Sequence, residues 1–117
     1  YKLCKQLGGN WRSAARAGLL HDLFLYDWHT HAKETGQYFH GFTHPKAALA
    51  NADRYFRLTG EERMIILRHM WPLTLVPPTS RAGYAVTCAD KYCSTVETTA
   101  RFKHWIRMCL FAQPARR

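Results

Sequence analysis

The chain has 117 residues, 47% of them hydrophobic, and this suits a single globular domain with a buried core. It has no apolar run of the roughly 18 residues that a transmembrane helix needs and opens with no signal-peptide pattern. We therefore expect a cytoplasmic protein with no membrane partner. The four cysteines form no C-x-x-C pair, so we expect reduced thiols and no cysteine zinc site.

The formal net charge of +9 indicates an anionic partner, such as a nucleotide, a nucleic acid or an acidic lipid, or else a solvated basic surface. The lysines and arginines are spread along the chain and form no dense tract with interleaved aromatic residues. Nucleic-acid binding is therefore not the favoured interpretation.

Helical patterns begin at the first residue. Residues 1–7 have the pattern of the last turns of a helix, and the glycine pair at 8–9 suits its C-terminal end. Asn10 can cap the next helix, which we expect to run to about residue 24. The polar and aromatic stretch 28–42 contains two glycines and predicts an irregular loop.

The second half of the chain continues the helical pattern. Thr59 and Glu62 have the spacing of a capping box, and Ser80 can cap a further helix. The elements that we expect are helix 44–58 with Pro45 in its first turn, helix 60–70, a proline-rich loop at 71–79, helix 81–98 and helix 100–111. No strand pattern competes, so the fold class is all-α, with five or six helices in one domain covering 1–117.

Five polar residues stand at helix ends or in mainly apolar helices: His21, Asp22, His44, His69 and Asp90. Imidazole and carboxylate groups are costly to bury unless they are paired. Together they make a ligand set for iron, manganese or zinc, in which a carboxylate can bridge two ions, although each alone is more often a structural residue. Adjacent residues do not face each other on a helix. We therefore expect His21 and Asp22 to diverge as ligands and not to form a catalytic dyad.

Four segments, "AARAGLLHDLF", "THPKAA", "IILRHMW" and "TCADKY", resemble in this order the HD-domain superfamily of metal-dependent phosphohydrolases. The resemblance implies an all-α bundle with a metal site at its centre. His21, Asp22 and Asp90 would hold a first ion, and Asp22 would bridge to a second ion held by His44 and His69.

The same resemblance implies one or two divalent transition-metal ions as cofactor, with iron or manganese first and zinc, nickel or cobalt as alternatives. A hydroxide between the ions would attack the phosphorus of a small phosphorylated substrate, for which we expect a nucleotide. The predicted activity is hydrolysis of a phosphoester or phosphoanhydride.

The sequence departs from the family pattern in two places. The family's first histidine ligand precedes the His-Asp pair, and no histidine does so here. We expect it to lie before Tyr1, so that the chain by itself binds the first ion weakly and can lack activity. Many relatives have a lysine where Leu25 stands. Lys33 or Lys91 could supply the catalytic acid instead, and Arg68 could bind a substrate phosphate.

Two other functions stay open on the sequence. One is a catalytically degenerate HD-fold module that binds a nucleotide or has a regulatory role. The other is a basic helical domain that binds nucleic acid, which rests on the charge alone. The apolar loop "WPLTLVPP" and the last helix could also serve an oligomer interface.

Overall fold

The computed structural model describes residues 1–23 and 40–111, with side chains at 1–23 and 44–108. Within these ranges the chain forms five helices and no strand, which confirms the all-α fold class. They are α1 (Lys2–Gln6), α2 (Trp11–Leu20), α4 (His40–Tyr55), α5 (Gly60–Arg68) and α6 (Arg81–Phe111). None of these helices is both long and apolar enough to cross a membrane.

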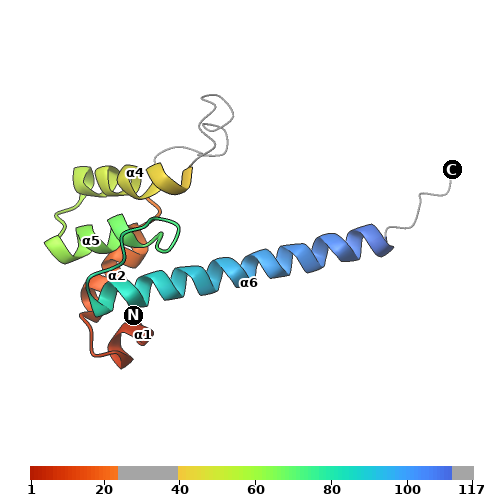
Figure 1. The fold of residues 1–117 in the computed structure, drawn as a ribbon, viewed down its shortest axis with the longest axis horizontal. Helices are drawn as coiled ribbons and strands as arrows, with labels where there is room; N and C mark the ends of the chain where they lie inside the picture. Colours follow the sequence, from red (N-terminus) through yellow and green to blue (C-terminus); the bar gives the residue numbers. More distant parts are fainter. Residues whose placement is uncertain (24–39, 112–117) are drawn as a thin grey trace.

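The helices pack around α2 and α5, which contact each other in the middle of the body. On one side α4 contacts both of them, and on the other side the first half of α6 contacts α1, α2 and α5. The second half of α6 extends well beyond the body (Figure 1), and there Phe102 and Trp105 are exposed. The ends of α2 and α5 and the first half of α6 therefore come together in one region.

Small side chains dominate the contacts between the helices. Side-chain size at the contact sets the distance between helix axes, so alanine lets the helices approach closely. Ile65 and Ile66 of α5 are the largest fully buried apolar residues of this core. The buried alanines are Ala14 and Ala17 of α2, Ala48 and Ala52 of α4, and Ala82 and Ala85 of α6.

The caps that the sequence predicts are formed. The side chains of Asn10, Thr59 and Ser80 each accept a hydrogen bond from the backbone N–H three residues further on. The Glu62 carboxylate accepts the N–H of Thr59, which completes the capping box. Gly8 follows the C-cap residue of α1, Leu7, and has a positive φ of 66°, as expected for a glycine that closes a helix.

Several helix boundaries differ from the prediction. Helix α2 ends at Leu20, four residues early, and α5 ends at Arg68 instead of residue 70. Helix α4 begins at His40 and so includes Pro45 within it, where we expected the proline in the first turn. Residues 40–42 of the predicted loop belong to α4 instead, so that part of the prediction was wrong, and residues 28–39 lie outside the described residues.

Helix α6 is one continuous helix of 31 residues, where we expected two. The prediction was wrong because threonines are weak helix breakers when their hydroxyls bond within the helix. Here the hydroxyls of Thr95 and Thr99 donate to the carbonyl oxygens four residues earlier, at 2.7 and 2.8 Å. No glycine or proline lies between residues 84 and 111 to end the helix.

Candidate metal centre

The His-Asp pair lies in the turn that follows α2. His21 is the C-cap residue of this helix, and Asp22 is the next residue of the turn. Because the helix ends at Leu20, the two side chains are free to approach, and the Nε2 atom of His21 lies 3.3 Å from Oδ2 of Asp22. The expectation that His21 and Asp22 diverge was therefore wrong, since it assumed that both stand inside a helix.

The ends of α2 and α5 have the same local arrangement. His69, like His21, is a C-cap residue in the right-handed helical conformation. Nδ1 of His21 lies 2.8 Å from the carbonyl oxygen of Gly18, and Nδ1 of His69 lies 2.7 Å from that of Ile66. A carbonyl oxygen only accepts, so in each ring Nδ1 must carry the hydrogen. In the neutral form of each ring, Nε2 then has a lone pair and is a possible metal ligand.

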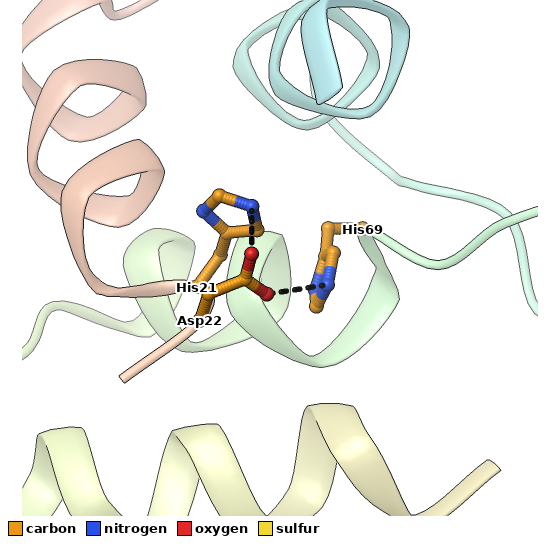
Figure 2. Close-up of side chains that lie close together, drawn as sticks. All are labelled: His21, Asp22 and His69. Atoms are coloured by element: carbon orange, nitrogen blue, oxygen red, sulfur yellow. Dashed lines mark ion pairs between the residues drawn. The ribbon is translucent and has the colours of Figure 1, made fainter. Parts of the chain in front are cut away.

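These two Nε2 atoms are buried and have no hydrogen-bond partner. Both face the carboxylate of Asp22, which stands between the two rings (Figure 2), and Nε2 of His69 lies 3.8 Å from Oδ1 of Asp22. A lone pair and a carboxylate oxygen are both acceptors and cannot satisfy each other. A metal ion between them would satisfy both rings, whereas a proton on Nε2 of His21 would satisfy that ring alone.

His44 and Asp90 complete the group. Nε2 of His44 lies 2.6 Å from Oδ1 of Asp22, and Oδ1 of Asp90 lies 3.5 Å from Nε2 of His21. The ring of His69 lies 4.8 Å from that of His21 and 5.3 Å from that of His44, measured between ring centroids. The fold therefore brings all five predicted side chains together, from α4, from α6 and from the turns after α2 and α5.

The five side chains offer three imidazoles and two carboxylates, a donor set that suits iron, manganese or zinc. One atom from each of His21, Asp22 and His69 can be chosen so that all three lie within 4.8 Å of one another. Burial differs across the group, because His69 is 1% exposed whereas Asp22 is 55% exposed. The group thus has a closed side at His69 and an open side at Asp22.

The charges in this group follow from burial and from the neighbouring ions. The hydrogen bond with His44 lowers the pKa of Asp22, and the interaction with His21 lowers the pKa of Asp90. Burial lowers the pKa of His69 to about 4. Burial also acts to lower the pKa of His21, but the Asp90 and Asp22 carboxylates outweigh it and raise that pKa. Near neutral pH both carboxylates are ionised and His69 is neutral, which are the forms that bind metal.

Lys91 supports the group from behind Asp90. Its Nζ atom lies 2.8 Å from Oδ2 of Asp90 and 3.4 Å from the carbonyl oxygen of His69. Asp90 therefore has Oδ1 towards His21, while its Oδ2 faces the ammonium group of Lys91. The sequence reasoning named Lys91 only as a possible acid, and the position directly after Asp90 was the signal for this supporting role.

A cavity of about 620 Å³ opens beside the group, between α2 and α6. His21, Asp22 and Asp90 line it together with small apolar side chains of both helices. Its other charged lining residue is Glu97, and within the described part of the chain no lysine or arginine lines it. A phosphate in this cavity would meet three carboxylates and the His21 imidazole, so most of its charge would have to be neutralised by cations that the group holds.

The two other predicted catalytic residues do not join the group. The guanidinium of Arg68 donates a hydrogen bond of 3.1 Å to the carbonyl oxygen of Pro77, in the loop after α5. Within the described ranges no polar contact links Arg68 to the five grouped side chains. Lys33 lies outside the described residues.

Comparison with known proteins adds no relative. No protein-family model, no curated protein and no solved structure matches this chain. The interpretation of the group therefore depends on its geometry and on the order of the four motifs.

Proposed function

We propose that the chain is a divalent-metal-dependent phosphohydrolase of the HD superfamily, acting on a small phosphorylated substrate, for which a nucleotide is the expected class. One observation carries the proposal. The Nε2 atoms of His21 and His69 are buried, have no hydrogen-bond partner and face one shared carboxylate. Buried polar atoms without a partner are rare in native proteins, and a metal ion would explain both at once.

The residue roles follow from the contacts within the group. Asp22 touches all three histidines and is the natural bridging ligand. His21 and Asp90 would hold one ion with it, and His44 and His69 the other. The carbonyl oxygens that fix Nδ1 of His21 and of His69 act as the outer partners that orient metal-ligating histidines.

The bound ions would supply a water of lowered pKa for attack on phosphorus and would neutralise charge on the phosphate oxygens. The protein itself would position the substrate. The cavity beside the group is large enough for a nucleotide-sized molecule, and its small side chains would exclude water from one face. Because three carboxylates line the cavity and none of its lining residues is a lysine or an arginine, we expect phosphate release to depend strictly on added metal.

The proposal is tested by metal analysis and a hydrolysis panel. The purified protein would be loaded with manganese or iron(II), its metal content measured, and phosphate release followed with a series of nucleotides. We expect about one or two ions per chain and metal-dependent release. His69→Gln should lose the bound metal and the phosphate release. The matched control is His104→Gln, at an exposed histidine of α6, and it should keep the metal and the activity.

Two results would contradict this function. One is a metal content below about 0.1 ion per chain after loading, since a two-metal site holds more. The other is a metal-loaded protein that binds nucleotides but releases no phosphate from any of them. That second result would instead support the non-catalytic binding module.

A further inference from the structure

A second cavity, of about 250 Å³, lies between α4, α5 and the loop that follows α5. It shares no lining residue with the cavity beside the five side chains of the candidate metal centre, which we call the metal group. Its lining residues are Pro45, Lys46, Leu67, Arg68, Thr74 and Val76. The sequence did not point to Lys46 or Thr74. They lie 28 residues apart in the chain, so no local pattern connects them.

This cavity carries two positive charges. Lys46 comes from α4 and Arg68 from the last turn of α5, and no acidic residue of the described chain lines the cavity. Within the same residues neither Lys46 nor Arg68 forms an ion pair with a carboxylate. The bond from Arg68 to the Pro77 carbonyl occupies one guanidinium N–H and holds the group in place, which leaves its other donors for a ligand.

One of the lining residues, Thr74, has a polar atom without a partner. The hydroxyl oxygen of Thr74 is buried and makes no hydrogen bond. The backbone N–H of Thr74 donates to the carbonyl oxygen of Met70 at 3.3 Å, which fixes the turn that places this side chain. A buried hydroxyl without a partner lowers stability. Thr74 lines the same cavity as Lys46 and Arg68, so a rotation of its side chain would let the hydroxyl pair with an acceptor bound there.

We propose that this cavity binds a phosphoryl oxyanion, with Lys46 and Arg68 as the cations and the Thr74 hydroxyl as a hydrogen-bond donor. A guanidinium offers several N–H donors in a fixed plane and suits a phosphate, and a lysine adds a point charge. Leu67 and Val76 give the cavity an apolar wall, which would contact the organic part of a phosphorylated ligand.

The phosphoryl group could come from two sources. Lys46 is two residues from His44, and Arg68 directly precedes His69, so the same two helices carry this cavity and the metal group. The ligand is then either a second phosphate of the substrate or a free phosphate compound that acts as an effector. Only this choice of source depends on the proposed hydrolase function; the anion site itself does not.

The test uses metal-free protein, so that it does not depend on the metal group. Binding of inorganic phosphate and of pyrophosphate would be measured by isothermal titration calorimetry after treatment with a chelator. We expect Lys46→Met to weaken binding about tenfold, the effect of losing one charge-assisted hydrogen bond. Lys103→Met removes an exposed lysine of α6 that lines neither cavity, and it should change binding less than about twofold.

Thr74→Val separates a binding role from a structural one. Valine keeps the shape of threonine and removes only the hydroxyl, so it should weaken anion binding severalfold while the urea midpoint of unfolding stays the same or rises. No binding by the wild-type protein would overturn the proposal, as would equal losses in Lys46→Met and Lys103→Met. A lower urea midpoint for Thr74→Val with unchanged binding would also overturn it.

The source of the phosphoryl group is decided in turnover. If Lys46→Met raises KM for a nucleoside triphosphate and leaves KM for the monophosphate unchanged, the cavity holds a second substrate phosphate. If added phosphate alters turnover of the wild type and not of Lys46→Met, it holds an effector. Either result identifies the source, and wild-type and variant kinetics that agree in both experiments rule out both sources, whereas the anion site itself stands or falls with the calorimetry.

Discussion

The turn after α2 and the turn after α5 each place a histidine in the same local geometry. The pKa values of these two histidines nevertheless shift in opposite directions. His21 and His69 each donate Nδ1–H to the carbonyl three residues back. His21 then faces the carboxylates of Asp22 and Asp90, which raise its pKa. His69 is enclosed with two other imidazoles beside it, and burial lowers its pKa to about 4. The helix end fixes the tautomer, and the tertiary neighbours fix the charge.

This contrast explains how the group balances its charges without metal. A proton on His21 would offset part of the negative charge of the carboxylates around it, and neutral His69 avoids a second cation in the closed part of the group. A metal ion would take the place of the proton on His21. The four predictions below test this difference between the two helix ends, from the largest expected effect to the smallest.

Asp22 is the residue that the two helix ends share, so its loss should have the largest effect. We expect Asp22→Asn to lower kcat/KM by about 10³-fold or more and to remove most of the bound metal, because both ion positions lose a ligand. Helix content by circular dichroism should not change, since Asp22 is more than half exposed. Asp53→Asn on α4 is the matched control, and full activity in Asp22→Asn would refute the bridging role.

The two histidines should differ in how much they stabilise the metal-free fold. His69→Ala empties a fully enclosed site and removes the hydrogen bond to the Ile66 carbonyl, so we expect a loss of about 3 kcal/mol in the free energy of unfolding. His21 is partly exposed, and His21→Ala should cost about 1 kcal/mol. Urea unfolding in the presence of a chelator measures both losses. A larger loss for His21→Ala would be inconsistent with the burial described above.

Acid should act on the two histidines in opposite directions. The folded pKa of His69, about 4, lies below its ordinary value of 6.5. Its contribution to stability is therefore complete above pH 6.5 and is lost as the pH falls towards 4, by about 2 kcal/mol between pH 8 and pH 5. The pKa of His21 is raised, so its contribution is complete below pH 6.5 and is lost as the pH rises through the folded pKa.

The measurement is a series of urea unfolding curves of metal-free protein between pH 5 and pH 8. The stability difference between wild type and His69→Gln should change with pH in one direction, and that between wild type and His21→Gln in the other. Asp22 and Asp90 have lowered pKa values and stay ionised over this window. Two differences with the same slope would show that the neighbours do not separate the two histidines.

Lys91 joins the two regions, because it contacts Asp90 on α6 and the carbonyl oxygen of His69 at the end of α5. We expect Lys91→Met to weaken manganese binding about tenfold, as is typical when an outer partner of a metal ligand is lost. Lys91→Arg should restore much of the affinity. Competition with a chelator of known affinity measures the change. Equal weakening by Lys103→Met would mean that the effect is one of overall charge.

Local sequence signals predicted the starts of α2, α5 and α6 well, whereas the start of α4 at His40 and the further start at residue 100 were predicted wrongly. Asn10, Thr59 and Ser80 cap their helices as expected, because a cap needs only a side chain and a backbone N–H three residues away. Helix ends were less predictable. The residues after Leu20 continue the apolar pattern, yet the helix stops there and lets Asp22 turn back to His21.

The members of the metal group were also predictable, and their contacts were not. A histidine or carboxylate in an apolar segment is visible in the sequence, and all five candidates do meet in the structure. Their distances depend on how α2, α4, α5 and α6 pack, which no local pattern encodes. The side chain of Arg68 shows the limit: its neighbour in sequence is His69, yet its guanidinium bonds to the loop at Pro77.

The sequence by itself determined the all-α fold class, the helix caps and the five candidate residues that the fold brings together, because each depends on residue type and short spacing. The tertiary structure alone decided that His21 and His69 differ in charge, that Lys91 supports Asp90, and that Lys46, Arg68 and Thr74 line one cavity. These features depend on burial and on contacts between segments far apart in the chain. Burial and long-range contacts both arise when the helices pack, so they cannot be predicted from the order of residues.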